Sequence, residues 1–202
     1  MTELPRVKII GLTGMSGAGK STVSGTFAES GYYVIDCDGV ARETARAGSP
    51  FLRELAGRFN GFVRTDGTLD RAAVAAAIFA DGEKRALYNK IIYPYITYNV
   101  IARIKRAAQV GEQYVLLDAP TLFEARLDGI CADIVSVIAP AQTCAERIMR
   151  RDGLSAQGAQ ARLSAQHGAQ FYASRSRVVI ENSGTQHELC EKARAAAELL
   201  KR

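Results

Sequence analysis

Residues 7–30 read VKIIGLTGMSGAGKSTVSGTFAES, and this stretch decides the fold of the chain. Its middle, GMSGAGKS at positions 14–21, fits the spacing G-x-x-x-x-G-K-S/T. A β-rich apolar run stands directly before it and a helical pattern directly after it, a context that a chance glycine-rich turn would lack. Glycines let backbone N–H groups converge on an anion, and the helix N-terminus adds partial positive charge. The stretch therefore predicts a phosphate-binding loop between a strand and a helix.

Within this loop, individual residue types have expected tasks. Lys20 is expected to reach the terminal phosphates of a nucleoside triphosphate, and the Ser21 hydroxyl to bind Mg²⁺. ATP and Mg²⁺ are therefore the expected cofactors, although GTPases, motor ATPases and small kinases share such loops. The chain is short and has no N/TKxD signature for guanine, which favours a small-molecule kinase. The residues expected to bind nucleotide are Gly14, Met15, Ser16, Gly17, Ala18, Gly19, Lys20, Ser21 and Thr22.

Five short apolar runs predict the strands of a parallel sheet, since near-continuous apolar runs are typical of strands covered on both faces. They span residues 7–12, 32–36, 114–118, 133–139 and 177–182. The predicted fold class is α/β, a P-loop NTPase three-layer α/β/α arrangement with a five-stranded parallel sheet. Three of the runs end in Asp36, Asp118 and Asn182, and the carboxyl ends of such strands are where α/β proteins bind ligands.

Helical patterns fill two long intervals between these runs. The first is rich in alanine and too long for one crossover helix, so it predicts a helical insertion over 41–111, with a turn at 64–70. The second predicts a lid over 141–175, because a kinase must close over two substrates to exclude water. The end of the chain reads as a plain amphipathic helix. The nucleotide-binding core would then comprise residues 1–40, 112–140 and 176–202.

The composition fits one globular chain: 202 residues, 48% hydrophobic and 23% charged, can bury a core without disulfides. The net charge of +5 comes mainly from dispersed arginines, which suit phosphate recognition and do not predict a nucleic-acid partner. Four scattered cysteines indicate reduced thiols in the cytoplasm. The opening MTELPRVKIIGLTG predicts no signal peptide, and no apolar run reaches the roughly 20 residues of a membrane helix. The oligomeric state stays open.

Further motifs follow the loop in a characteristic order. They are VIDCDGVAR (34–42), DGTLDR (66–71), IFAD (78–81), IIYPYI (91–96), LLDAPTLFE (116–124), RIMRRD (147–152) and VIENSG (179–184). From about residue 7 to residue 184 the chain thus resembles the dephospho-CoA kinase family. The resemblance implies transfer of the γ-phosphoryl group of ATP to the ribose 3′-hydroxyl of dephospho-CoA, a small-molecule substrate. It also implies a core, a helical CoA-binding insertion and a lid.

Three acids have expected roles in this chemistry. The resemblance implies that Asp38 receives the proton of the acceptor hydroxyl; the alternative is an N-cap for the helix that follows. Asp36 would lie on the same side as Asp38 if the strand stays extended. There it would be near the substrate or a Mg²⁺-bound water; the alternative is a plain acid at the end of a strand. Asp118 ends its strand where P-loop proteins often place an acid that contacts Mg²⁺ through water; the alternative is a turn residue.

Basic residues and one short segment complete the expected site. Arg147, Arg150 and Arg151 share a helix face at i, i+3 and i+4, and the resemblance assigns Arg147 and Arg151 to the transferring phosphoryl group. It implies that Arg42 and Arg71 contact phosphates of the acceptor, with surface ion pairs as the alternative. It places Asn182 beside adenine, with a turn as the alternative. The acceptor segment that it implies comprises Pro120, Leu122, Phe123 and Glu124, although Phe123 equally suits the core and Glu124 a solvated face.

Several positions depart from the family pattern. The usual His-Pro is Tyr93-Pro94, Thr121 replaces a leucine, and Ser176-Arg177 stands near the usual Ala-Asp. Tyrosine titrates at about pH 10 and does not replace histidine as a proton carrier at neutral pH. A related kinase acting on another hydroxyl acceptor, or a nucleotide-binding regulator without turnover, therefore stays an alternative. The two histidines, His167 and His187, are expected to be surface residues without a role.

Overall fold

A computed structural model describes residues 7–202, and these residues divide into two compact units. One unit contains residues 7–36 and 104–202, and the other contains residues 37–103. Residues 1–6 lie outside the described residues. They are the start of the expected core segment 1–40, and the expectation of no signal peptide partly depends on them. Each unit is described by itself.

The first unit is built on a parallel sheet in the order β2-β3-β1-β4-β5. The strands are β1 (Lys8–Gly14), β2 (Tyr33–Asp36), β3 (Tyr114–Asp118), β4 (Asp133–Ile138) and β5 (Val178–Glu181). All five predicted strands are therefore confirmed, and so is their parallel direction. β1 is the central strand and is buried along most of its length, as its continuous apolar run requires.

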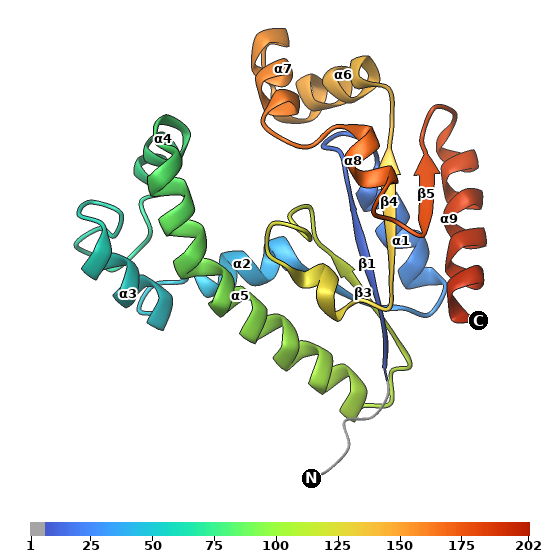
Figure 1. Ribbon diagram of the computed structural model, residues 1–202, viewed down its shortest axis with the longest axis horizontal. Coiled ribbons are helices and arrows are strands. Elements are labelled where there is room, and N and C mark those ends of the chain that lie inside the picture. The colour runs from blue at the N-terminus through green and yellow to red at the C-terminus, as the bar shows by residue number, and fades with distance from the viewer. Residues whose placement is uncertain (1–6) are drawn as a thin grey trace. The chain divides into compact units, whose positions relative to one another are not determined.

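Helices α1 (Lys20–Glu29) and α9 (Gln186–Lys201) lie side by side along this sheet (Figure 1). Phe27 of α1 is fully buried together with Leu12, Leu116 and Val137 of three strands. Tyr32 precedes β2, and its buried hydroxyl donates a 2.9 Å hydrogen bond to the Ala197 carbonyl of α9. The helix expected at the end of the chain is confirmed, and Thr185 and Glu188 form a capping box at its start.

The interval predicted as a lid contains α6 (Ala141–Asp152), α7 (Ala156–Ser164) and α8 (Ala169–Ala173). Gly153 ends α6 in the left-handed region at φ 67°, and Ser155 caps α7 by accepting from the Gly158 N–H. A 3₁₀ helix, η1 (Leu127–Ile130), precedes β4. Helix α8 packs on β1, β4 and β5, so this part of the interval belongs to the sheet unit. Its function as a lid stays a prediction.

The second unit is helical, with α2 (Cys37–Thr44), α3 (Pro50–Arg58), α4 (Arg71–Ala80) and most of α5 (Gly82–Gln109). Phe51 anchors it, because this buried ring meets Tyr88 and Tyr95 edge-on at centroid distances of 6.1 and 5.9 Å. Asn99 of α5 donates to the Thr44 hydroxyl of α2 over 3.0 Å. The expected turn at 64–70 is present, and helix α4 begins directly after it. The CoA-binding role of this unit stays a prediction.

Two further observations concern the described residues as a whole. Within residues 7–202, no helix combines the length and the apolar character needed to cross a membrane. The four cysteines are free thiols: Cys37 and Cys144 are buried, and Cys131 and Cys190 are half-buried. Burial raises the pKa of Cys131 to about 12, so this thiol stays protonated at neutral pH.

Candidate active site

The phosphate loop follows the central strand of the sheet, with β3 on one side of β1 and β4 on the other. In parallel α/β sheets this is the position where neighbouring connections diverge and leave room for a ligand. Gly14 ends β1 at φ 132°, and a Cβ there would lie 2.1 Å from the Val137 carbonyl oxygen. The next residue, Met15, donates its N–H to the same oxygen over 3.2 Å. The loop can leave the sheet along this path only because residue 14 is glycine.

Two more glycines bring other segments close to the loop. A Cβ on Gly17 would lie 2.7 Å from the Cys144 carbonyl oxygen of α6, and one on Gly19 would lie 2.6 Å from Asn182 Nδ2. Both glycines also have positive φ, at 77° and 104°. The motif's glycines are thus required by close packing on both sides of the loop as well as by its curvature.

Side chains from three segments donate hydrogen bonds to four carbonyls of the loop. The Lys20 ammonium donates to the Gly14 and Met15 carbonyls over 2.9 and 3.1 Å. Arg147 of α6 donates to the Gly17 carbonyl over 3.3 Å, and the buried Asn182 donates to the Ala18 carbonyl over 2.8 Å. With its carbonyls turned toward these donors, the loop is held in one shape, and the N-terminus of α1 adds its partial positive charge.

The structure places two of the predicted acids next to each other. Asp36 and Asp118 are register partners at the carboxyl ends of β2 and β3, and Asp118 also pairs with Leu12 of β1. Asp118 is half-buried and Asp36 is exposed. Asp118 is on the strand next to the one that carries the loop, and Asp36 is one strand further away; such a pair of carboxylates suits a cation that accompanies phosphate.

The condition under which Asp36 and Asp38 were expected to share a side is not met. It required the strand to stay extended, but helix α2 begins at Cys37, so the chain changes direction between the two acids. Asp38 lies in the first turn of α2. An acid in the first turn complements the partial positive charge of the helix start. Its catalytic role stays a prediction.

The segment after β3 divides into core and surface. Pro120 is half-buried, and its carbonyl accepts a 3.3 Å hydrogen bond from the buried Thr13 hydroxyl. Leu122 is fully buried and packs against the bare backbone of Gly11; its contact with substrate stays a prediction. Phe123 meets Phe171 of α8 edge-on at 5.3 Å, which supports the core alternative for this ring.

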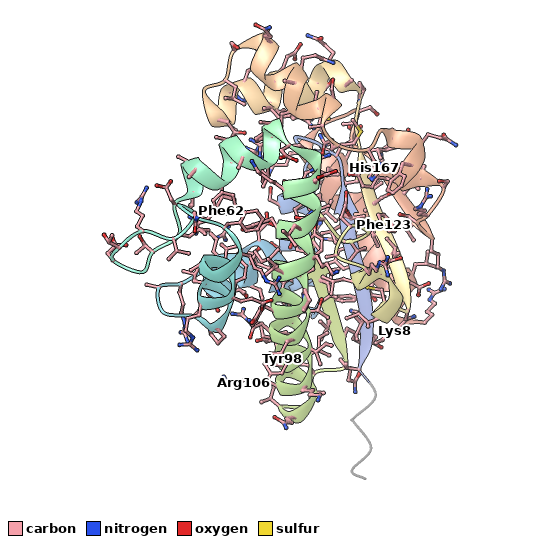
Figure 2. All side chains as sticks on the ribbon, turned by 60° about the vertical axis from the view of Figure 1, so that its left-hand side comes forward. Lys8, Phe62, Tyr98, Arg106, Phe123 and His167 are labelled. Atoms are coloured by element: carbon pink, nitrogen blue, oxygen red, sulfur yellow. The ribbon has the colours of Figure 1, made fainter. Side chains whose placement is uncertain are left out.

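His167 and Phe123, both labelled in Figure 2, pack against the same ring, Phe171, and His167 also lies next to Glu124. The His167 Nε2 lies 3.6 Å from a Glu124 oxygen, and the imidazole stacks on Phe171 with centroids 3.5 Å apart. His167 is a partly exposed residue, as expected, but it is packed and paired. Glu124 stays accessible at the end of this cluster, where an acceptor-binding role stays a prediction.

The three arginines of α6 have different surroundings. Arg147 is half-buried and reaches the loop, as described above. Arg151 instead donates two hydrogen bonds to Asp152, at 2.7 and 2.8 Å, and Arg162 of α7 joins the same carboxylate. The Arg151 guanidinium holds the pKa of Asp152 below its usual range. Arg150 is exposed, in agreement with a solvated face. The structure therefore brings Arg147, but not Arg151, to the loop.

The remaining predicted basic residues belong to the second unit. Arg42 is exposed in the last turn of α2, and Arg71 is the first residue of α4. Burial raises the pKa of Tyr88, and the nearby charge of Arg71 opposes this rise. Tyr93, which stands where the family pattern has histidine, is half-buried within α5. Contacts of Arg42 and Arg71 with an acceptor stay predictions.

One polar contact of the loop had no sequence signal. The Ser16 N–H donates to the side-chain oxygen of Gln166 over 3.0 Å, although the two residues are 150 positions apart. Gln166 follows α7 in the stretch LSAQHG, a composition that identifies neither a motif nor a partner. Only the path of the chain from α7 to α8 brings it to the loop.

The residues present fit a magnesium nucleotide. Ser21 is exposed in the first turn of α1, and Asp118 ends the adjacent strand; their oxygens are the hard ligands that Mg²⁺ prefers. Among the described residues, no group of three or more His, Cys, Asp or Glu side chains gathers to hold a metal ion. Protein ligands alone would therefore be few, as is usual where nucleotide phosphates and water complete the coordination of Mg²⁺.

Comparison with known proteins agrees with this arrangement. The family model described as dephospho-CoA kinase matches residues 8–188. A dephospho-CoA kinase of Moorella thermoacetica is 40% identical over 196 residues, covering 96% of this chain and 92% of the relative. One of Anaeromyxobacter dehalogenans is 38% identical over 188 residues, covering 93% and 89%.

A solved structure shares the fold over nearly the whole chain. A crystal structure from Thermus thermophilus superposes with a TM-score of 0.83 at 33% identity, covering 96% of this chain and 97% of that one. The match to the family model extends from β1, through the loop and the helical unit, to the first turn of α9. The loop on the central strand, the acids beside it and these matches together show that the chain belongs to the dephospho-CoA kinase family.

Proposed function

We propose that this chain transfers the γ-phosphoryl group of ATP to the ribose 3′-hydroxyl of dephospho-CoA, which yields ADP and CoA. The observation that carries the proposal is the phosphate loop on the central strand, with Asp118 on the adjacent strand and Asp36 in register with Asp118. Membership of the dephospho-CoA kinase family supports the acceptor, since relatives at 38 and 40% identity carry that name. The reaction would complete the biosynthesis of CoA.

In this proposal the loop and its helix bind the nucleotide. The amides of residues 14–22 surround the phosphates, and the Lys20 ammonium moves from the Gly14 and Met15 carbonyls to phosphate oxygens. Ser21 and Asp118 would hold Mg²⁺, which neutralises phosphate charge when it is bound. The Asn182 side chain donates a hydrogen bond to the Ala18 carbonyl, which supports a role in shaping the nucleotide site. Its proposed position beside adenine depends on the family resemblance.

Acceptor chemistry is assigned to carboxylates and arginines. Asp38 accepts the proton of the attacking hydroxyl, and Asp36 supports this end of the site. Arg147 already bonds the loop and stabilises charge on the transferring group, whereas Arg151 would first have to leave Asp152. Arg42, Arg71, Pro120, Phe123 and Glu124 are proposed to contact dephospho-CoA.

We also propose that the protein acts in the cytoplasm on small molecules, without a nucleic-acid partner. The four free cysteines support a reducing compartment, because thiols persist there unpaired. The dispersed arginines support recognition of the phosphate groups that both substrates carry.

The proposal is tested by coupled ADP release from ATP and Mg²⁺ with dephospho-CoA, against a panel of nucleosides, sugars and shikimate-like alcohols. We expect rapid release with dephospho-CoA and little with the others. A preference for another alcohol would instead identify a related kinase with a changed acceptor, as Tyr93 in place of the family's histidine permits. ATP binding without turnover on any acceptor would identify a regulator.

A further inference from the structure

Two neighbouring residues of the segment after β3 are held by two residues that lie in and just before α8. Phe123 meets the Phe171 ring edge-on at a centroid distance of 5.3 Å. The His167 imidazole stacks on the same Phe171 ring, with centroids 3.5 Å apart and planes 11° apart. Its Nε2 lies 3.6 Å from a Glu124 carboxylate oxygen. The four side chains thus form a closed set of contacts, in which residues 123 and 124 each meet one member of the pair 167 and 171.

The plane of the imidazole is fixed independently of the carboxylate. Phe171 also carries the Arg175 guanidinium, 4.0 Å from its ring centre. Two planar groups at these distances cannot share one face of a ring, so His167 and Arg175 cover opposite faces of Phe171. Stacking and cation–π contact both favour this arrangement. The imidazole therefore presents a fixed nitrogen edge to Glu124.

The backbone that carries Glu124 is anchored by the two residues before it. Leu122 is fully buried against Gly11, and Phe123 is partly buried against the main core. The Glu124 and His167 side chains are 36 and 44% exposed, so the pair lies at the surface, where a ligand can reach it. What remains to be determined at this position is the direction of the Glu124 side chain.

The stacked imidazole makes this pair different from an ordinary surface ion pair. Such pairs contribute little, because two flexible side chains must be ordered to form them. Here stacking has already ordered the imidazole, so only the Glu124 side chain loses conformational freedom. A protonated imidazole attracts the carboxylate, and histidine is the side chain that changes its charge between about pH 5 and pH 8.

We propose that His167 is a positioning residue, whose imidazole holds the Glu124 carboxylate in the orientation that contacts the acceptor. The sequence by itself predicts no role for this histidine. The inference deepens the proposed function and rests on it in one respect, that Glu124 contacts dephospho-CoA.

Two other charged or titratable groups lie near the imidazole. The Tyr172 ring is 6.3 Å from it between centroids. Burial, and secondarily the charge of Glu124, raises the pKa of Tyr172 to about 12, so this phenol stays neutral at physiological pH. Arg175 lies on the far face of Phe171. Glu124 is therefore the group expected to respond when His167 changes its charge.

The decisive variant is His167→Phe, which keeps a ring on Phe171 and removes both nitrogens. His167→Gln is a second variant in case the larger ring disturbs packing. The same change at the exposed histidine of α9, His187→Gln, is its matched control. Glu124→Gln removes the charge of the partner. These variants, and the double variant His167→Phe/Glu124→Gln, are measured for kcat, for the KM of dephospho-CoA and for the KM of ATP at about pH 6 and about pH 8.

We expect both His167 variants to raise the KM for dephospho-CoA roughly two- to fivefold at the lower pH, the size of effect that one exposed ion pair produces. The values of kcat and of the KM for ATP should stay near those of the wild type. The difference in KM should shrink at the higher pH, because histidine loses its charge over this range. In the Glu124→Gln background, loss of the imidazole should add little. The control should behave as wild type.

An unchanged KM for dephospho-CoA in both His167 variants would overturn the proposal. Effects of His167→Phe and Glu124→Gln that simply multiply in the double variant would also overturn it, since residues that act independently behave in this way. Failure of both His167 variants to fold, measured by urea denaturation, would contradict it as well, because His167 would then be a structural residue.

The dissociation constant of dephospho-CoA, measured by calorimetry without ATP, separates the role of His167 from the proposed function. Wild-type protein that binds dephospho-CoA but transfers no phosphoryl group to it contradicts the proposed function, and weaker binding in the His167 variants would still support the positioning role. Normal transfer together with His167 variants that match the control contradicts the role of His167 alone.

Discussion

At the scale of single residues, the phosphate loop is held from outside as well as by its own backbone. Lys20, Arg147 and Asn182 each donate to a different part of its carbonyl face, from α1, α6 and the end of β5. Gln166 accepts from one of its amides. Carbonyls that are bonded to these donors leave other N–H groups of the loop for an anion, so the contacts with the carbonyls help to hold the loop in a shape that can bind phosphate.

The first residue-scale prediction concerns Asp38. Replacing it by Asn keeps the shape of the side chain and removes the base, so kcat with dephospho-CoA should fall by about 10²–10⁴-fold while the dissociation constant of ATP stays near normal. Steady-state kinetics and calorimetry measure the two effects. Glu43→Gln, which removes an exposed carboxylate from the same helix, is the control and should keep full activity. A normal kcat in Asp38→Asn would exclude Asp38 as the base.

The second concerns Asn182, whose buried side chain donates to the Ala18 carbonyl. In Asn182→Asp a carboxylate oxygen replaces the donor and faces that carbonyl, so unfolding free energy should fall by about 1–3 kcal/mol and the KM for ATP should rise. Chemical denaturation and kinetics at varied ATP report both. Asn60→Asp, the same change at an exposed turn, should alter neither quantity. An unchanged KM would mean that this contact does not shape the nucleotide site.

At the scale of elements, the strands were predictable because fully buried strands carry continuous apolar sequence. The run 114–118 matches β3 at both ends. β1 extends two residues beyond its apolar run, to Gly14, because Thr13 and Gly14 still pair with β4. The order of the strands was not predictable, since it depends on which connections cross, and a local pattern does not record that.

The site was predictable only where a motif has a fixed geometry. The loop and the acids at the ends of β2 and β3 fall in this class. No local pattern records that Leu122 packs on Gly11 or that Arg151 binds Asp152, because burial and competing pairs decide where such side chains point. Gln166 was missed because its partner is 150 residues away.

The element-scale prediction tests the packing of β1 against β4. Gly14→Ala would place a methyl group 2.1 Å from the Val137 oxygen, a clash with backbone that cannot be relieved by rotating a side chain. We expect loss of several kcal/mol of unfolding free energy, or failure to fold, and no ATP binding. Gly31→Ala is the matched control: φ is 84° and nothing lies within 4 Å, so only backbone strain of about 1–2 kcal/mol is expected. Equal losses in denaturation experiments would contradict the packing argument.

At the scale of the whole molecule, buried tyrosines connect distant parts of the sheet unit. Tyr32 is 4% exposed, joins the start of β2 to α9, and contacts Phe27 and Tyr114. Burial raises the pKa of Tyr32 from 10.0 to about 12, and that of Tyr172 in α8 also to about 12. Between these values the folded protein keeps protons that the unfolded chain releases, so the stability they provide is present below pH 10 and decreases toward pH 12.

Above pH 10, we therefore expect each of these two tyrosines to lower the unfolding free energy by roughly 1 kcal/mol for every pH unit. In Tyr32→Phe, the slope of unfolding free energy against pH should lose the contribution of one titrating proton. The variant should also lose about 1 kcal/mol of unfolding free energy at pH 7, because the hydrogen bond to Ala197 is gone. Urea denaturation at several pH values measures both. Tyr98→Phe, which removes a phenol that is 73% exposed, is the control. A slope that is the same in Tyr32→Phe and wild type would contradict the argument.

The central claim is that this chain phosphorylates the ribose 3′-hydroxyl of dephospho-CoA with ATP. The most direct test follows the product: purified protein is incubated with ATP, Mg²⁺ and dephospho-CoA, and phosphorus NMR identifies the new phosphate while ADP is quantified. We expect equal amounts of ADP and CoA, and almost none of either with Lys20→Ala, which lacks the ammonium that binds phosphate. ADP without CoA, or a phosphate on any other hydroxyl, would contradict it.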